Sequence, residues 1–415
     1  MRVRIHRGTQ EIGGTCIELE AQGCRIAIDV GMPLDVGDAD PDGLLPAVAG
    51  FREPSDDLAG IVISHPHQDH YGLARHVRAD VPIYIGEAAN NILAAAARYV
   101  PDGHWFANAQ FYRDRRSLSI GTFTITPYLV DHSAFDAYAL LVEADGRRVF
   151  YSGDFRAHGR KSGLMERIFE TPPKDIDVLM MEGTTIGRTD SAEGAETEAD
   201  LERKFAAAFE ATPGAHLVWT SAQNIDRIVT VFRAAKRTGR LLVIDLYTAV
   251  VLEATGKATI PQSWWDGVRL YVPYRQRIQI KKLGLFDDLR HHSVNRVYPE
   301  DLAAIRERAV VLFRPPLMVD RGLGGILDGA RLTYSMWRGY LEHAGTRRVL
   351  AWLGANGMPW DTIHTSGHAP LLDLQRLTTA LAPDRLVPIH SFETARFKDH
   401  FANVELKEDG VWWDV

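Results

Sequence analysis

The sequence predicts an α/β protein with two domains. At 415 residues the chain is too long for one ordinary hydrophobic core. Short strands separated by glycine fill the N-terminal part, whereas strands alternate with helices from about residue 185, as is typical of a parallel sheet. Strand-end histidines occur in the N-terminal part and again near the C-terminus. We therefore predict a first domain over residues 1–184, a second over 185–355 and a return to the first over 356–415.

The composition is that of an ordinary soluble protein. Hydrophobic residues make up 46% and charged residues 24%, and no run of 18 apolar residues indicates a membrane span. The N-terminus lacks a signal-peptide pattern and the two cysteines, Cys16 and Cys24, are expected to be reduced, so we expect a cytoplasmic protein without membrane partners. The formal charge of −7 argues against a broad basic surface for duplex nucleic acid, but bound cations would still permit a phosphate substrate.

The first domain begins with strands at 3–6, 16–20 and 25–29, whose alternation and glycine-rich connections are typical of an antiparallel meander. Asp29 ends the third strand. An aspartate at this position is expected either to form a turn or to orient a histidine that binds a metal ion.

The central motif follows the apolar run 61–63 and reads Ser64-His65-Pro66-His67-Gln68-Asp69-His70. Side chains two residues apart on an extended strand point the same way, so His65 and His67 can share one metal ion. Asp69 and His70 follow as the chain turns, and they can face a second ion close by. Imidazole and carboxylate are the ligands typical of zinc, or of manganese where oxygen ligands dominate.

Further elements follow the motif: a helix from Tyr71 to Val77, a strand at 81–85, a helix at 87–100, and strands at 122–130, 138–143 and 147–151. Two residues after these strands are candidate ligands. His132 can supply a third nitrogen for the ion at His65 and His67. Asp154 can bridge two ions about 3.5–4 Å apart.

The second domain is expected to contain strands at 216–220, 241–245, 268–273 and 309–313, with helices at 201–211, at 223–238 and up to Gly256. Thr197 to Asp200 resembles a capping box at the start of the first helix. In the return segment, Ile363-His364-Thr365-Ser366-Gly367-His368-Ala369 precedes an amphipathic helix near 371–381, and a strand ends in His390. His390 can complete the second ion site.

The order of these motifs resembles the metallo-β-lactamase superfamily, and H-T-S-G-H-A followed by P-I-H resembles its β-CASP branch, which includes ribonuclease J-like nucleases. The resemblance covers essentially the whole chain and implies an αββα sandwich with an inserted Rossmann-like cap domain. It also implies two zinc ions, with manganese as the alternative. His65, His67 and His132 would hold one ion, Asp69, His70 and His390 the other, and Asp154 would bridge them, with Asp29 orienting a ligand.

The same resemblance implies that His368 pairs with an acidic residue on a helix, for which Glu202 is the best match and Glu198 the rival. A carboxylate beside His368 would raise its pKa and keep it protonated as a general acid. Ser366 and Gly367 are candidates to hold a phosphate. Ser221, Asn224 and Arg227, at a strand-to-helix turn, are further candidates, although S-x-x-N is also an ordinary helix cap.

We therefore expect a ribonuclease that hydrolyses single-stranded RNA by a two-metal mechanism, with a metal-bridging hydroxide as nucleophile and Asp69 among the catalytic residues. RNA is expected rather than DNA because DNA-directed members of the branch usually carry valine where this chain has His390. The alternatives are a dinuclear zinc hydrolase of a small ester, thioester or phosphodiester, and a catalytically silent subunit that binds RNA. The sequence leaves open whether the chain forms a homodimer.

Overall fold

The computed structural model describes residues 1–34, 37, 39–188 and 194–415, which form two compact units. The first unit comprises Met1–Leu93, His104–Ala195 and Gly367–Val415, and the second comprises Ala94–Gly103 and Glu196–Ser366. The units change 11 residues later in the chain than the predicted domain limits, at 195 against 184 and at 366 against 355. The predicted limits themselves stay a prediction.

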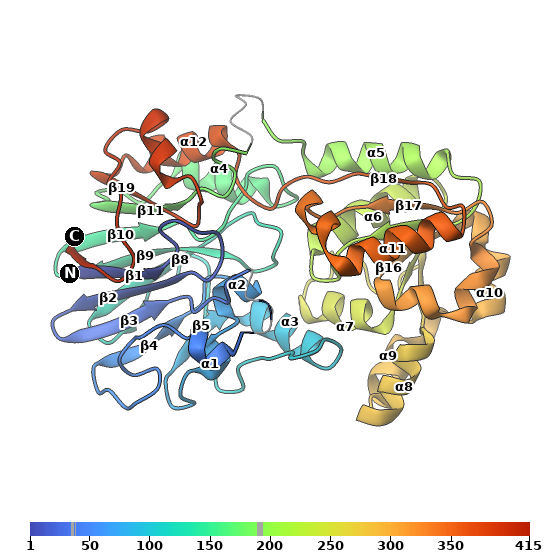
Figure 1. Cartoon of the computed structure of the whole chain (residues 1–415), viewed down its shortest axis with the longest axis horizontal. Helices are drawn as coiled ribbons and strands as arrows, with labels where there is room; N and C mark the ends of the chain where they lie inside the picture. The colour runs from blue at the N-terminus through green and yellow to red at the C-terminus, as the bar shows by residue number, and fades with distance from the viewer. Residues whose placement is uncertain (35–36, 38, 189–193) are drawn as a thin grey trace. The chain divides into compact units, whose positions relative to one another are not determined.

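The first unit is built on two mixed sheets (Figure 1). One sheet has the order β20-β1-β2-β3-β4-β5-β6, with bounds β1 Arg2–Arg7, β2 Cys16–Ala21, β3 Cys24–Ile28, β4 Leu58–Val62, β5 Ile83–Gly86, β6 Gln110–Tyr112 and β20 Trp412–Asp414. The other has the order β19-β11-β10-β9-β8-β7, with bounds β7 Leu118–Ile120, β8 Phe123–Leu129, β9 Tyr138–Ala144, β10 Arg147–Tyr151, β11 Val178–Glu182 and β19 Arg385–Ile389.

Three hydrophobic cores hold the layers of this unit together. The central core joins side chains of both sheets, such as Ile17, Ile26, Leu140 and Val149. A second core joins the β19–β7 sheet to helices α4 (Ser162–Glu170) and α12 (Leu371–Leu381). A third joins the other sheet to α2 (Gln68–Tyr71) and α3 (Glu87–Ala97), whereas the short helix α1 (Pro41–Leu44) contributes only Leu44 to it. The arrangement is the predicted αββα sandwich.

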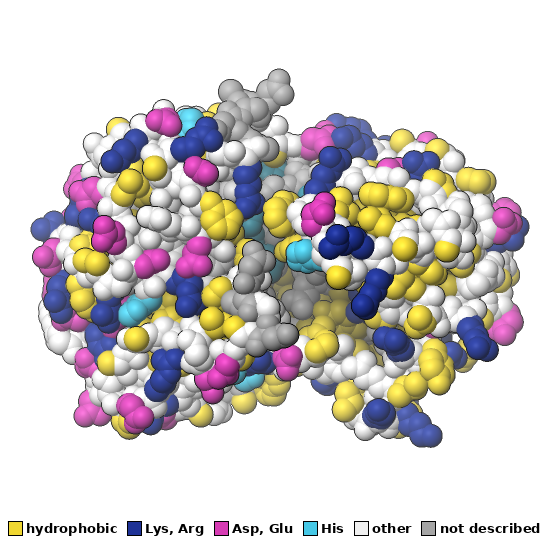
Figure 2. Space-filling view, viewed as in Figure 1, with side chains coloured by type: hydrophobic (Ala, Val, Ile, Leu, Met, Phe, Trp, Pro, Cys, Tyr) yellow, Lys and Arg dark blue, Asp and Glu magenta, His cyan; other side chains and the backbone are white. Residues whose placement is uncertain are grey.

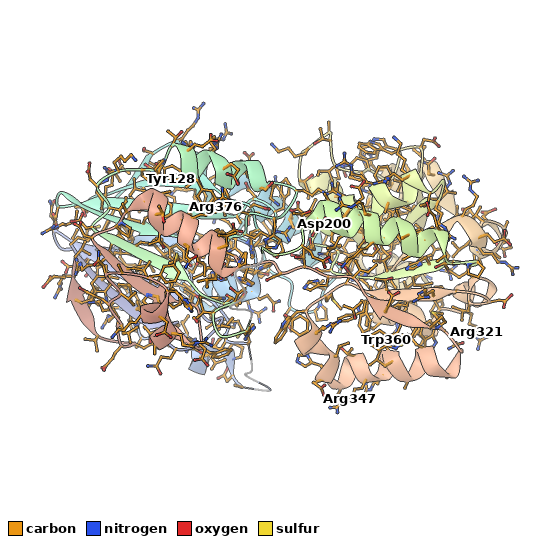
Figure 3. The ribbon with its side chains drawn as sticks, turned by 90° about the horizontal axis from the view of Figure 1, so that it is seen from above. Tyr128, Asp200, Arg321, Arg347, Trp360 and Arg376 are labelled. Carbon is orange, nitrogen blue, oxygen red and sulfur yellow. The ribbon has the colours of Figure 1, made fainter. Side chains whose placement is uncertain are left out.

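Helices α4 and α12 are also linked by charge. Arg376 projects from α12, as labelled in Figure 3, and its Nη2 lies 2.5 Å from Glu166 Oε2 of α4. The pair is partly exposed, so it contributes about 1 kcal/mol or less. The buried leucines of α12, at positions 371, 374, 377 and 381, recur with helical spacing and contribute most of the packing energy.

The second unit is organised around one all-parallel sheet in the order β15-β14-β13-β16-β12-β17-β18, as in a Rossmann-like domain. Its strands are β12 His216–Trp219, β13 Leu241–Ile244, β14 Val268–Tyr271, β15 Arg296–Val297, β16 Ala309–Phe313, β17 Arg331–Tyr334 and β18 Trp360–Thr362. Its helices are α5 Glu198–Glu210, α6 Ile225–Arg237, α7 Leu246–Ala254, α8 Tyr274–Leu283, α9 Phe286–His292, α10 Pro299–Ala304 and α11 Ala344–Ala355.

Local sequence signals explain several helix boundaries and miss others. The predicted capping box at α5 is confirmed, since Thr197 and Asp200 bond each other's backbone amides (Asp200 is labelled in Figure 3). The helix predicted from Tyr71 to Val77 is wrong: α2 already begins at Gln68, and a short 3₁₀ turn follows at Ala74–His76. The helix predicted over 87–100 ends at Ala97. Strand β11 was not predicted.

Charged and hydrophobic side chains share the visible face of each unit (Figure 2), and the two cysteines form no disulfide. Acidic, basic and hydrophobic side chains are intermixed on the face of each unit shown in Figure 2. Cys16 and Cys24 are both free thiols. Among the helices in the described part of the chain, none combines the length and hydrophobicity needed to span a bilayer.

Candidate metal centre

Strand ends from both sheets of the first unit bring the candidate ligands together. His65 and His67 follow β4, His132 follows β8, Asp154 follows β10 and His390 follows β19. The turn before Asp154 depends on Gly153, whose φ of +53° is left-handed and whose added Cβ would lie 2.7 Å from the Tyr138 carbonyl oxygen. A glycine is therefore required to present Asp154 at this position.

His65, His67 and His132 form the first group of donors, whose ligand atoms lie within 4.8 Å of one another. The Nε2 of His132 is 3.2 Å from Nδ1 of His67. The other ring nitrogen of His132 donates to the carbonyl oxygen of Gly367 at 2.6 Å, which turns Nε2 toward the group. Burial lowers the pKa of all three imidazoles, so the neutral, metal-binding form is favoured.

Asp69, His70, Asp154 and His390 form the second group, again within 4.8 Å. Oδ2 of Asp154 lies 3.2 Å from His70 Nε2 and 3.7 Å from His390 Nε2. The same oxygen is 3.6 Å from His65 Nε2 of the first group. Asp154 therefore lies between the two groups, as a bridging carboxylate must. Burial raises the pKa of Asp154, but the surrounding histidines outweigh this effect and lower it well below its usual value.

The buried donor atoms of this centre fit bound cations. Nε2 of His65, His70 and His390 and both carboxylate oxygens of Asp154 are buried, and they have no hydrogen-bond partner among the described residues. An unsatisfied buried polar atom costs roughly 1–3 kcal/mol, and more when it is charged. Three imidazole nitrogens converging on one carboxylate form the donor set that divalent zinc or manganese binds. The residues present thus fit two metal ions, whose identity the donor set leaves open.

A layer of hydrogen bonds behind the ligands holds their rings in place. The Nδ1 atom of His70 lies 2.8 Å from Asp29 Oδ2, which also accepts from the hydroxyls of Ser64 and Tyr151. The carboxylates of Asp154 and Asp29 raise the pKa of His70 well above its usual value, although burial acts to lower it. His390 Nδ1 lies 3.0 Å from the Thr15 hydroxyl. Asp29 and His390 both have left-handed backbones, with φ of +57° and +51°, a strain that is common at functional sites.

His368 lies beside the second group and is paired with Glu182. Its Nδ1 is 3.1 Å from Glu182 Oε2 and 3.8 Å from Asp154 Oδ2. The Glu182 carboxylate also accepts from the backbone amides of Phe155 and Thr184. Burial opposes protonation, but the carboxylates of Glu182 and Asp154 outweigh it and raise the pKa of His368 to about 9. The His368 side chain keeps 22% of its surface exposed, whereas Glu182 is buried.

The geometry gives His368 a partner that the sequence did not suggest, Glu182, and the pairing with Glu202 stays a prediction. Glu202 lies on α5 in the second unit, where its carboxylate faces Arg237 at 3.4 Å and Arg233 at 3.9 Å. The rival, Glu198, is buried in the same unit and pairs with Arg227 at 2.9 Å. Glu182 was missed because β11 was missed. Its signal is the same as that of Asp154 and His390, since an apolar run, Val178 to Met181, ends in a single ionisable residue.

The phosphate-binding residues predicted in the second unit have local roles. Asn224 caps α6 by accepting from the Arg227 amide, and the Ser221 hydroxyl accepts from the Gln223 amide. The prediction for Arg227 needs correction: its guanidinium has no exposed surface and is engaged by Glu198 and Ser335, so it is not accessible to a phosphate. Gly367 is held at the centre by its carbonyl bond to His132. Ser366, which is the last residue of the second unit, stays a proposal.

Comparison with known proteins agrees with this fold. The model of the beta-lactamase superfamily domain matches residues 38–239. The match and the fold together support the metallo-β-lactamase superfamily. Within it the chain is a distant homologue of ribonuclease J, consistent with the β-CASP branch. Ribonuclease J of Helicobacter pylori (strain B128) is 22% identical over 97% of this chain and 59% of its own length.

Two further comparisons extend the result. An RNase J-like protein of Methanocaldococcus jannaschii is 25% identical over 80% of this chain and 73% of its own length. The crystal structure of a protein of unknown function from Enterococcus faecalis V583 shares the fold, with a TM-score of 0.80 and 20% identity over 99% of both chains. The chain spans about three fifths of the length of the Helicobacter ribonuclease J.

Proposed function

We propose that the chain is a metal-dependent ribonuclease that hydrolyses phosphodiester bonds in single-stranded RNA. The observation that carries the proposal is the Asp154 carboxylate, buried between two groups of histidines, with a proton-donating pair, His368 and Glu182, beside it. The distant homology to ribonuclease J supports RNA as the substrate. Zinc is the expected metal, with manganese as the alternative.

Two bound cations would be held by His65, His67 and His132 and by Asp69, His70 and His390, with Asp154 between them. When bound, they activate water and neutralise negative charge on a phosphodiester. Asp69 is the partly exposed carboxylate of the centre, with 17% of its side chain exposed and Oδ2 3.8 Å from His390 Nε2. Its proposed role is to orient the attacking water and accept its proton.

His368 is the proposed general acid, which gives its proton to the leaving ribose oxygen. Its exposed edge provides access to that oxygen, and Glu182 fixes its other side through Nδ1. Nδ1 bonded to a carboxylate leaves the Nε2 proton as the one to donate. Glu182 therefore positions His368 and favours its protonated form.

The test is cleavage of a 5′-monophosphorylated single-stranded RNA beside a matching DNA and bis-nitrophenyl phosphate, with added zinc or manganese. Wild type, His368→Ala and the control His104→Ala are compared. His104 is, like His368, a partly exposed histidine of the first unit, but it belongs to none of the four His/Asp/Glu clusters. We expect wild type to cleave the RNA only when metal is added. His368→Ala should lose this cleavage, and His104→Ala should keep it.

Two outcomes would overturn the proposal. Turnover of only the small ester, indifferent to His368, would make the protein a small-molecule hydrolase. Metal-independent RNA binding without cleavage of any substrate would make it a silent RNA-binding subunit. In the expected case, the ladder of products distinguishes an exonuclease from an endonuclease.

A further inference from the structure

A second cluster of metal-binding side chains lies in the second unit, apart from the residues of the candidate metal centre. Glu253 is near the end of α7, and His291 and His292 are the last two residues of α9. One oxygen of the Glu253 carboxylate is 2.8 Å from His291 Nε2, and the other is 3.2 Å from His292 Nε2. The three side chains offer ligand atoms that all lie within 4.8 Å of one another.

These distances are somewhat shorter than the spacing of ligands around a tetrahedral ion. Metal–ligand bonds of about 2.0–2.1 Å place neighbouring ligand atoms about 3.4 Å apart. The observed separations of 2.8 and 3.2 Å lie close to this value, so small side-chain shifts would admit an ion. Near neutral pH most histidines are neutral, and a neutral imidazole can bind a cation through its free nitrogen.

His292 is prepared for this role on its far side. Its side chain is 1% exposed, and its Nδ1 is 2.8 Å from the hydroxyl of the buried Ser263. A hydroxyl that accepts from Nδ1 leaves the Nε2 lone pair directed toward Glu253, as outer hydrogen bonds do for metal-binding histidines. The ring of Trp264 lies nearly parallel to that of His292, with 6.0 Å between the ring centroids.

The other side of the cluster is open to solvent. Glu253 and His291 have 44% and 54% of their side chains exposed, so an ion has an entry path and water can complete its coordination. Two imidazoles, one carboxylate and a water form a donor set that binds zinc in preference to magnesium or calcium.

We propose that Glu253, His291 and His292 bind a zinc-type divalent cation that ties the end of α9 to α7. The bound ion would fix the end of one helix onto another helix of the same unit. It is independent of the proposed ribonuclease activity.

The test counts zinc in the full-length protein after equilibration with zinc and removal of the unbound metal. Glu253→Gln and His291→Ala should each hold one zinc fewer per chain than wild type, with unchanged RNA cleavage. His343→Ala is the matched control, since His343 is also an exposed histidine of the second unit but belongs to none of the metal-binding clusters. It should hold as much zinc as wild type.

A second readout uses Trp264, whose ring lies 5.4 Å from His291. Cobalt binding at the cluster should quench the fluorescence of Trp264, and Trp264→Phe or His291→Ala should remove that part of the quenching. Equal zinc content in wild type, Glu253→Gln and His291→Ala would overturn the proposal, as would cobalt quenching that persists in His291→Ala. Because both substituted residues are about half exposed, loss of the fold would not explain a lost ion.

Discussion

Each of the two units buries a carboxylate, but the surroundings of the two carboxylates differ. In the first unit, Asp154 has no hydrogen-bond partner among the described residues and is surrounded by imidazole nitrogens that also lack one. In the second unit, Glu198 is equally buried, yet Arg227 binds both of its oxygens and the Thr230 hydroxyl donates to one of them at 2.6 Å. Burial alone therefore does not mark a functional site; at Asp154 the distinguishing feature is that several buried ligand atoms without partners converge at one place.

The difference has a physical reason. A buried charge is tolerated only when it is paired, and the pair at Glu198 is complete within the protein. Asp154 instead faces imidazole nitrogens of both groups, an arrangement that bound cations would complete. We expect substitutions at Asp154 to act through metal and activity, and substitutions at Glu198 to act through folding.

The largest effect is expected for Asp154→Ala, which should reduce RNA cleavage to background. The variant loses the carboxylate that faces both groups of histidines, so metal content should fall together with activity. Metal analysis and cleavage assays on the same sample would measure both. Added zinc should raise the melting temperature of wild type more than that of the variant, which keeps the separate cluster of Glu253, His291 and His292. A variant that kept its full metal content and activity would contradict the bridging role.

His368→Ala should keep the metal and lose about 10²–10⁴-fold in turnover, or about 3–5 kcal/mol of transition-state stabilisation. Metal content and single-turnover cleavage would be measured together. Glu182→Gln should retain the hydrogen bond to His368 but not the negative charge. Its turnover should fall less than that of His368→Ala. If His368→Ala emptied a metal site, His368 would be a metal ligand like Asp154 and not the general acid.

Glu198→Ala should destabilise the second unit by about 3–5 kcal/mol, because it leaves the Arg227 guanidinium buried and unpaired. Urea unfolding in the presence of a chelator would show this loss, which should not depend on metal. The double variant Glu198→Ala/Arg227→Met should recover part of the stability. A loss of stability that required bound metal would contradict the distinction between Glu198 and Asp154.

Glu18 is a paired buried carboxylate in the first unit. It therefore tests whether the difference between Asp154 and Glu198 arises from the unit or from the pairing. Burial raises its pKa, but bonds from His6, Arg4 and Arg25 outweigh this and lower the pKa to about 2. Its ionised form therefore stabilises the fold on the order of 1–3 kcal/mol above pH 4.5, and the contribution is lost as the pH falls toward 2. The stability gap between wild type and Glu18→Gln, measured in chelator, should narrow over that range; a gap independent of pH would contradict the pairing.

The smallest effect is expected for Glu202→Gln. The Glu202 carboxylate faces two arginines that are themselves more than half exposed, so the change should cost about 1 kcal/mol or less. RNA cleavage should stay at the wild-type level. A loss comparable to that of His368→Ala would restore Glu202 as the acidic partner that the sequence suggested.

Much of the candidate centre could be predicted because its ligands follow apolar strands. His65, His67, Asp69 and His70 occur in one short motif, and His132, Asp154 and His390 each stand alone after a strand. The capping box at Thr197 was equally readable, because a cap depends on residues three positions apart. The roles that failed were those that depended on long-range pairing.

The sequence by itself indicated the parallel sheet of the second unit, since strand periodicity and local motifs are properties of neighbouring residues. Its resemblance to the metallo-β-lactamase superfamily implied the αββα sandwich and the candidate metal-binding side chains. Only the tertiary structure decided the pairings. It gave His368 the carboxylate of Glu182, 186 positions away, and enclosed Arg227 with Glu198 and Ser335. It also placed Glu253 against His291 and His292. Sequence patterns show which residues end a strand, but charge pairing depends on distances that exist only after the chain has folded.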